Sequence, residues 1–328
     1  MENKRYGALD GLRMLAAFGI VMMHMRANND YVDMQGGCLY NTIIPSFTNF
    51  VFLFMVISAF GMCCGYYDKI LHNKISMTDF YKKRFVKVLP FFTLLVMLDV
   101  VIEHSMNSIY EGFADITLLF GLLPNAGNIS VIGVGWFLGL VFVFYLMFPF
   151  FCVLLENKKR AWIAFVISLV YNFVGTQYFN ISRNNILYSG CFFIAGGLLY
   201  LYREQIAKIN KWILLMIITV SVLLYYLIGG NTYTYMVVSV ALVLYAMVST
   251  GGILDNKVTK FFSDISMEIY LSHMVIFRII EKLKLSTMFG KGWLQYSITV
   301  ILVLTGATVF SVIMKKLINK VECKATTI

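Results

Sequence analysis

The sequence is poor in charge, since Asp, Glu, Lys and Arg make up 13% of its 328 residues, against about 25% in soluble domains. Hydrophobic residues make up 59% of the chain, and it holds four prolines. No internal repeat, low-complexity tract or Pro/Ser-rich linker divides it. These absences exclude a soluble or disordered chain. They predict an all-α, polytopic integral membrane protein with a single domain over residues 1–328.

Cysteine patterns typical of metal or disulfide chemistry are also absent. The six cysteines have neither metal-ligand spacing nor a paired framework, so we predict no metal site; they are Cys38, Cys63, Cys64, Cys152, Cys191 and Cys323. The net charge of +10 would suggest nucleic acid in a soluble protein. In a membrane protein the placement of positive charge matters more, so we expect the lipid bilayer and no nucleic acid as a partner.

Long apolar runs are abundant. A membrane span needs about 20 mostly apolar residues, and this criterion predicts ten transmembrane helices. They lie near 11–29, 45–66, 86–104, 132–155, 161–179, 185–202, 211–229, 232–250, 264–281 and 293–317. The run 113–124 is too short to cross and is expected to re-enter the membrane or lie on its surface.

Lys and Arg predict the orientation of these spans. Alternate connecting segments collect most of them, from Lys4 and Arg5 to the four lysines after residue 314. The other segments hold Arg26, Arg183, Lys282, Lys284 and Lys291. The positive-inside rule therefore places both termini in the cytoplasm. The first apolar run lacks an Ala-x-Ala-like exit, so we read it as a retained span and not a signal peptide.

The first span carries two ionisable groups, Arg13 and His24, each costing roughly 2.5 to 3.5 kcal/mol inside a membrane. Eleven residues separate them, which puts them on one helix face with His24 about 16 Å deeper. Arg13 snorkelling to lipid phosphate and His24 bonding a neighbouring helix is the structural alternative. We favour a functional pair, because ionisable groups inside membranes usually serve function. Asp10 is expected to cap this helix and not to pair with Arg13.

Four further stretches carry candidate residues. The third span opens with the basic run TDFYKKRFVKVLP, which suits either anionic lipid or a phosphorylated cytosolic ligand. The others are FMVISAFGM, GWFLGLVFVFYLMFP and DISMEIYLSHMVIF. Their polar or aromatic candidates are Ser58; Trp136 and Tyr145; and Ser266, Glu268, Tyr270 and His273.

Taken in order, the five stretches resemble the membrane-bound acyltransferase-3 family. The family's "LDGLR…H" helix is matched from Leu9 to Arg13 and at His24, and its "FFxxSGF" looks like FMVISAF. Its "RxxRxxP" looks like RFVKVLP, with Lys87 at the second arginine. The "WFL…FYL…P" and "ISYxIYLxH" patterns are met by Trp136, Tyr145 and Pro149, and by ISMEIYLSH.

The resemblance implies transfer of an acyl group, commonly acetyl, from cytosolic acyl-CoA to a carbohydrate hydroxyl on the outer side. The acceptor would be a surface polysaccharide or a lipid-linked glycan, the location the bacterial cytoplasmic membrane, and no cofactor would be bound permanently. His24 would be the catalytic base or nucleophile. The CoA-binding residues would be Arg13, Lys83, Arg84 and Lys87, and the acceptor-side or supporting residues would be Ser58, Trp136, Tyr145, Glu268, Tyr270 and His273.

Two departures from the family pattern matter. Lys87 is a point charge where arginine makes a two-pronged contact, and Val141 stands where many members carry a glutamate. A carboxylate that orients His24 must therefore come from elsewhere, the candidates being Asp30, Asp33, Glu103 and Glu268. Glu268 could equally pair with Arg278. For His273 we favour packing or a hydrogen bond over direct catalysis.

Two readings from other classes stay open. A transporter or flippase of an anionic or glycan substrate would use Arg13 and His24 to line a pathway, although no inverted repeat is apparent. A membrane sensor or scaffold would need a partner-binding domain, which we do not find. We expect no fused extracellular domain after the last span, so the acceptor is expected to reach the embedded site itself or through a partner. Homo-oligomerisation is left open.

Overall fold

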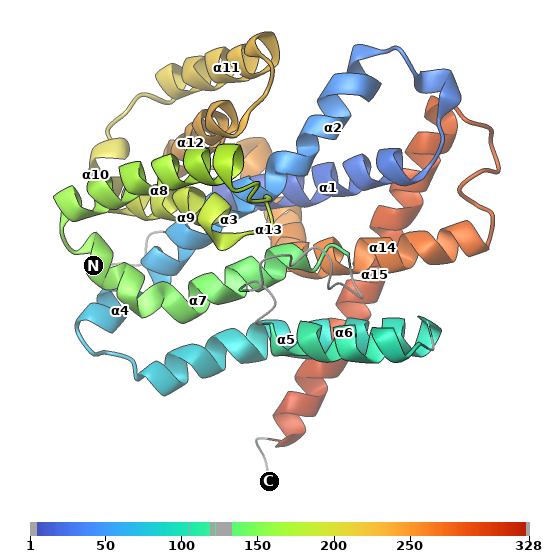
Figure 1. Cartoon of the computed structure of the whole chain (residues 1–328), viewed down its shortest axis with the longest axis horizontal. Coiled ribbons are helices and arrows are strands. Elements are labelled where there is room, and N and C mark those ends of the chain that lie inside the picture. Colours follow the sequence, from blue (N-terminus) through green and yellow to red (C-terminus); the bar gives the residue numbers. More distant parts are fainter. Residues whose placement is uncertain (1–4, 104, 119–121, 123–132, 326–328) are drawn as a thin grey trace.

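The computed structural model of the chain describes residues 5–103, 105–118, 122 and 133–325 (Figure 1). These residues form helices joined by short connections, and the described part contains no strand. The longer helices are α1 (Ala8–Asn28), α3 (Phe50–Met62), α5 (Met77–Glu103), α6 (Met106–Thr117), α7 (Trp136–Leu155), α8 (Lys158–Tyr178), α9 (Ile186–Leu201), α11 (Lys211–Ile228), α12 (Thr232–Val248), α13 (Lys257–Asp264), α14 (Ser266–Lys282) and α15 (Trp293–Ala325). The short ones are η1 (Val32–Met34), η2 (Leu39–Ile43), α2 (Ile44–Ser46), η3 (Phe47–Asn49), η4 (Cys63–Tyr67), α4 (Asp68–Leu71), α10 (Arg203–Ile206) and η7 (Gly252–Leu254).

The all-α prediction is confirmed for the described residues, whereas the count of ten spans is not. Every predicted span overlaps a helix, but six segments are long and apolar enough to cross a membrane: Ala8–Asn28, Leu39–Leu71, Trp136–Leu155, Lys158–Tyr178, Lys211–Ile228 and Trp293–Lys320. A seventh would be the pair α12 and η7–α13, bent by 98°. At 17 residues, with Glu268 and Arg278, α14 is too short and polar to qualify. Of the predicted re-entrant run, α6 covers the part up to Thr117, and most of the remainder lies outside the described residues.

Helix α1 lies at the centre and contacts α3, α12, α13, α14 and α15. In Figure 1 most long helices run in roughly the same direction, whereas α15 crosses the molecule diagonally. In α8, and likewise in α11, only about 17% of the residues in the most apolar stretch are buried inside the molecule. Their apolar side chains are therefore available to lipid.

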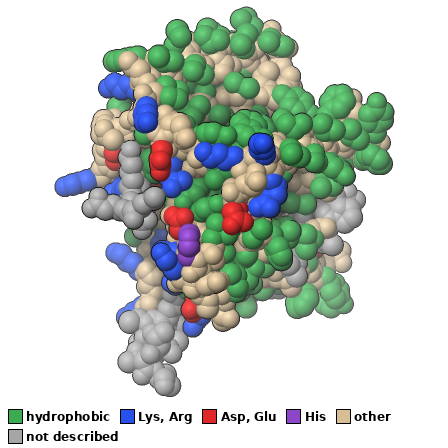
Figure 2. All heavy atoms as spheres, turned by 90° about the vertical axis from the view of Figure 1, so that its left-hand side faces the viewer, with side chains coloured by type: hydrophobic (Ala, Val, Ile, Leu, Met, Phe, Trp, Pro, Cys, Tyr) green, Lys and Arg blue, Asp and Glu red, His purple; other side chains and the backbone are tan. Residues whose placement is uncertain are grey.

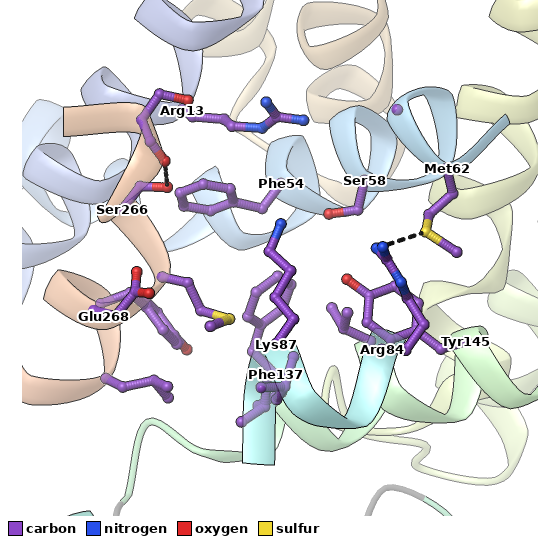
Figure 3. A pocket seen from close by; sticks show the side chains of 18 of the residues that line it. Arg13, Phe54, Ser58, Met62, Arg84, Lys87, Phe137, Tyr145, Ser266 and Glu268 are labelled. Atoms are coloured by element: carbon purple, nitrogen blue, oxygen red, sulfur yellow. Dashed lines mark hydrogen bonds between the residues drawn. The ribbon is translucent and has the colours of Figure 1, made fainter. Parts of the chain in front are cut away.

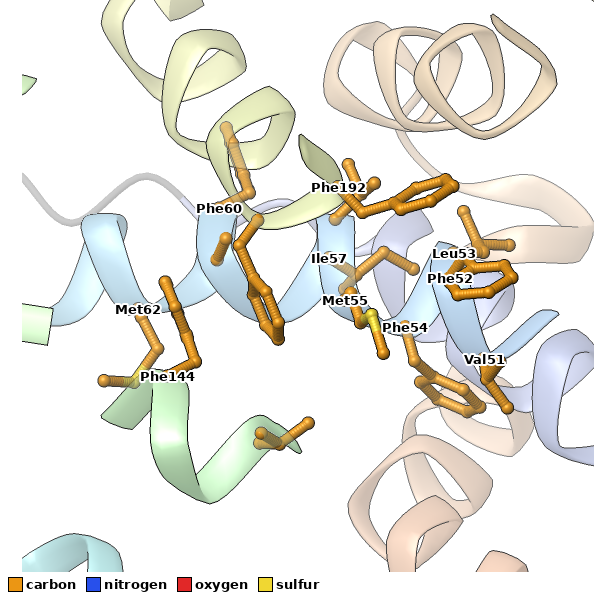
Figure 4. Close-up of a cluster of buried hydrophobic side chains, with 14 of the residues drawn as sticks. Val51, Phe52, Leu53, Phe54, Met55, Ile57, Phe60, Met62, Phe144 and Phe192 are labelled. Atoms are coloured by element: carbon orange, nitrogen blue, oxygen red, sulfur yellow. The ribbon is translucent and has the colours of Figure 1, made fainter. Parts of the chain in front are cut away.

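Close packing between α3 and α9 forms much of the core (Figure 4). Phe52 stacks on Phe192 with ring centroids 4.5 Å apart, and Phe144 of α7 stacks on Phe193 at 4.0 Å. Gly196 permits this approach, because a Cβ there would lie 2.3 Å from the carbonyl oxygen of Val56. Small residues at helix contacts are typical of membrane proteins.

One end of the molecule is basic. It holds the N-terminal residues and the connections next to α4, α8 and α10, and Figure 2 looks onto it. Lys and Arg side chains gather there among apolar surroundings. Exposed lysines at these connections are Lys69, Lys74, Lys158, Lys159, Lys208 and Lys211. We call this the basic end; it is the end that the sequence predicts to be cytoplasmic.

Candidate active site

A cavity of about 540 Å³ opens among α1, α3, α5, α7, α14 and α15 (Figure 3). Its volume falls within the range of about 300–1,000 Å³ that is usual for small-molecule sites. Eight of the candidate residues lie in its wall, together with Val141, the position that departs from the family pattern; the eight are Arg13, Ser58, Arg84, Lys87, Tyr145, Ser266, Glu268 and Tyr270. The packing of five separate stretches thus produces one site.

Four cations reach the cavity. Arg13 comes from α1, Arg84 and Lys87 lie three residues apart on α5, and Lys315 comes from α15. Figure 3 shows the Lys87 side chain extending into the cavity toward Phe54 and Ser58. Lys83, predicted to join them, is exposed and is not part of the wall. The structure therefore does not bring Lys83 into this wall, and its role in donor binding stays a prediction.

Arg84 is held in a cage of neighbouring side chains. It donates to the Tyr66 hydroxyl at 2.6 Å and contacts the Met62 sulfur at 3.4 Å. Its guanidinium also lies 4.6 Å from the centre of the Tyr66 ring and 5.8 Å from that of Tyr145. Tyr66 belongs to η4, a π-helical turn, and such turns are frequent at functional sites. The Arg84 side chain is therefore pre-oriented toward the cavity.

Arg13 lies beside an acidic neighbour and a glycine. Asp10 Oδ1 is 3.5 Å from its guanidinium, and Asp10 also accepts from Arg5 at 2.7 Å and from Ser263 at 2.8 Å. The prediction that Asp10 caps α1 is wrong, because the helix already begins at Ala8. In the first turn, the negative charge of Asp10 instead interacts favourably with the positive end of the helix dipole. A Cβ at Gly61 would stand 3.2 Å from the Arg13 guanidinium, so glycine leaves room for it.

Glu268 has a partner that the sequence analysis missed. Lys315 lies 2.9 Å from its carboxylate and donates to the carbonyl of Asp264 at 2.6 Å. Arg278, the partner considered from sequence, instead pairs with Asp99 at 2.7 Å. In the sequence, Lys315 is one of four lysines after residue 314, and nothing near it sets it apart from the others. It reaches Glu268 because α15 crosses the molecule diagonally.

An aromatic wall closes the side of the cavity away from the basic end. Phe54 lies 6.0 Å from Phe137, and Phe137 lies 5.4 Å from Tyr270 between ring centroids. The Tyr270 hydroxyl donates to the carbonyl of Val134 at 2.7 Å. Trp136, expected to line the site, packs against Phe137 but is not part of the wall.

His24 and His273 lie together beyond Tyr270. Their rings are 5.0 Å apart, and the His273 ring is 6.0 Å from that of Tyr270. Neither histidine is among the wall residues of the cavity. The four cations of the cavity and the histidine pair are therefore separated by the aromatic wall.

The hydrogen bonding of His273 defines its ring. Nδ1 lies 2.6 Å from the carbonyl oxygen of Tyr270, to which it donates, so Nε2 is the unprotonated nitrogen of the neutral ring. Nε2 is buried and has no hydrogen-bond partner among the described residues. The packing interpretation of His273 fits its complete burial.

None of the described carboxylates hydrogen-bonds to His24. Asp30 pairs with Lys291 at 3.3 Å, and Glu268 with Lys315. Asp33 lies near Gly292, and the side chain of Glu103 is outside the described part. His273 is therefore the titratable group that packs beside His24 in the described structure.

Comparison with known proteins decides the family. Residues 6–312 match the model of the acyltransferase domain that defines the acyltransferase-3 family. The chain belongs to the acyltransferase-3 family. The resemblance of the five stretches to this family is thereby confirmed.

A similar curated protein is the acyltransferase MdmB of Streptomyces mycarofaciens, 28% identical over 171 residues. The match covers 48% of this chain and 42% of MdmB, so the chain spans less than half of that relative. No solved structure matches the chain.

Proposed function

We propose that this acyltransferase moves an acyl group, most simply acetyl, from cytosolic acyl-CoA to a hydroxyl of a surface polysaccharide or lipid-linked glycan. The basic end would face the cytoplasm of a bacterium, with the chain in the cytoplasmic membrane and both termini inside. The observation that carries the proposal is the cavity itself, which joins four cations to an aromatic wall with two histidines behind it.

The donor fits this cavity by charge and shape. CoA carries phosphates at one end and a thioester at the other, joined by a flexible pantetheine arm. Arg84 and Lys87 would bind the phosphates, because guanidinium and ammonium groups make strong charge-assisted hydrogen bonds to phosphate. Arg13, on the central helix, would contact the phosphates or the arm as it passes inward. Ser58 and Tyr145 lie in the same wall and would contact the arm.

Transfer requires the thioester to pass the aromatic wall and reach His24. There the imidazole takes the proton of the acceptor hydroxyl while its oxygen attacks the thioester carbonyl carbon. The new C–O bond forms, the C–S bond breaks, and the CoA thiolate takes back the proton. In the two-step alternative the His24 nitrogen attacks the carbonyl carbon and the C–S bond breaks, releasing the CoA thiolate. The acceptor oxygen then attacks the acyl carbon, the bond to His24 breaks, and the hydroxyl proton passes to the thiolate. His273 would support the His24 ring.

The first experiment is CoA binding to the purified protein, measured by calorimetry. Wild type should bind acetyl-CoA, and Arg84→Ala with Lys87→Ala should weaken binding by about tenfold or more, since each charged hydrogen bond contributes roughly 1.5–3 kcal/mol. Lys83→Ala is the matched control, because it removes a lysine of the same helix outside the cavity.

The same titration separates the enzyme from a transporter. A flippase of glycans has no reason to bind CoA, so folded wild-type protein without CoA affinity would favour transport. Equal losses in Lys83→Ala and Lys87→Ala would indicate a general surface-charge effect and would remove the assignment of the cavity to the donor.

A further inference from the structure

A third arginine, away from the basic end, is built into the structure in an unusual way. Arg183 lies in the connection between α8 and α9 and donates to Thr48 twice, to its hydroxyl at 2.9 Å and to its carbonyl at 2.7 Å. Its guanidinium carbon lies 5.0 Å from the centre of the Phe52 ring and 5.4 Å from that of Trp136. It is therefore wedged between aromatic side chains of α3 and α7.

The charge of Arg183 is not neutralised by a carboxylate among the residues that the structure describes. Arg5, Arg13, Arg160 and Arg278 each have an acidic partner. Arg183 has none in the described part, and its Nε is buried without a hydrogen-bond partner there. A cation taken out of water without a counter-charge is costly. Arg84, assigned above to phosphate, likewise has a buried Nε without a partner in the described part.

Contacts between aromatic rings connect Arg183 to the side of the aromatic wall where the two histidines lie. Trp136, on which it stacks, packs against Phe137, the wall residue next to Tyr270. The Tyr270 ring in turn lies 6.0 Å from that of His273, and the His273 ring lies 5.0 Å from that of His24. An anion bound here would lie close to the proposed catalytic base, across the wall from the donor phosphates.

We propose that Arg183, with Trp136 and Phe52, forms an anion-binding subsite for the acceptor beside His24, so that the preferred acceptor carries a carboxylate or a phosphate near the acylated sugar. The inference rests on the proposed acyl transfer, because only that reaction makes the bound anion part of an acceptor. Binding of the anion itself can be measured without turnover. The carboxylate would come from an acidic sugar, and the phosphate from a lipid-linked precursor. Cation–π stacking fixes the plane of the guanidinium, and the Nε–H, which Thr48 does not take, would donate to the anion.

The test is a binding titration with three probes: methyl glucuronide, glucose 1-phosphate and the neutral methyl glucoside. It is carried out on the Arg84→Ala/Lys87→Ala protein, which weakens phosphate binding at the donor cavity because two of its four cations are removed. We expect one anionic probe to bind about tenfold more tightly than the neutral one, the value of a charge-assisted hydrogen bond. The probe that is preferred identifies the carboxylate or the phosphate source.

Variants assign the preference to Arg183. Arg183→Gln should abolish it, Arg183→Lys should keep part of it, and Lys282→Gln, which removes an exposed cation of the predicted outer side, should leave it unchanged. If neither anion binds more tightly than the neutral sugar, or if Arg183→Gln keeps the preference, the proposal is wrong. The comparison of probes on the parent protein decides the question even if Arg183→Gln fails to fold. Loss of CoA binding in an otherwise anion-selective protein would refute the proposed donor and leave this site in place.

Discussion

Glu268 provides a sharp test of the donor cavity, because it is the buried acid in a site proposed to take phosphates. It is 6% exposed, lies in the cavity wall and pairs with Lys315 at 2.9 Å. The substitution Glu268→Gln keeps the shape and a hydrogen-bond acceptor for Lys315, but removes the negative charge. We expect acetyl-CoA to bind more tightly to this variant.

The magnitude follows from Coulomb's law. Two unit charges roughly 8–10 Å apart at an effective dielectric of about 20 interact by roughly 2 kcal/mol. Removing that repulsion corresponds to a gain of about tenfold to thirtyfold in CoA affinity. Lys315, freed from its partner, adds a cation to the phosphate site. Because Lys315 is partly exposed, the loss of the ion pair should cost about 1 kcal/mol or less in stability.

The assay is calorimetric titration with acetyl-CoA at two salt concentrations, since screening reduces an electrostatic gain. Glu281→Gln is the matched control, an exposed acid near the other end of α14. The double variant Glu268→Gln/Lys315→Ala should lose most of the gain. Weaker CoA binding by Glu268→Gln would refute the reasoning, because it would mean that Glu268 contacts the donor favourably.

Three further outcomes are expected. Gly196→Ala should destabilise the fold by about 1–3 kcal/mol through overpacking. The control is Gly190→Ala, whose Cβ would meet nothing within 4 Å and which should unfold at a higher temperature than Gly196→Ala. Equal unfolding temperatures would contradict the close α3–α9 contact. Lys87→Arg should match or exceed the CoA affinity of wild type, because it restores a two-pronged phosphate contact; a large loss in calorimetry would show that the site is shaped around lysine. His273→Asn can still donate to the Tyr270 carbonyl, so turnover should stay within about tenfold of wild type; a loss as deep as that of His24→Ala would make His273 a proton carrier.

Much of the site follows from sequence because its members lie within single helices. The spacing of Arg13 and His24 on α1, and of Arg84 and Lys87 on α5, fixes their relative faces through the helical repeat. Lys83 lies outside the cavity wall, because periodicity alone does not say which side chains of a basic helix face the cavity. That choice depends on how α5 packs against its neighbours.

What sequence could not predict is which residues of different helices meet. Lys315 reaches Glu268 because α15 crosses the molecule diagonally, and Arg183 reaches Trp136 through a loop distant in the chain. The predicted count of ten spans is not confirmed, since six segments of the described part meet the criterion of length and apolarity. Helix α14 is held by burial against α1 and α15, so it need not meet the length and apolarity that lipid contact requires.

The most direct test of the account is turnover of acetyl-CoA by purified wild type and His24→Ala, with CoA affinity measured on the same preparations and a crude glycan fraction as acceptor. The account predicts that His24→Ala binds CoA as wild type does, because His24 lies beyond the wall of the donor cavity, while acyl transfer to the glycan fraction is lost. Transfer that persists in folded His24→Ala protein would contradict the central claim that His24 performs the chemistry.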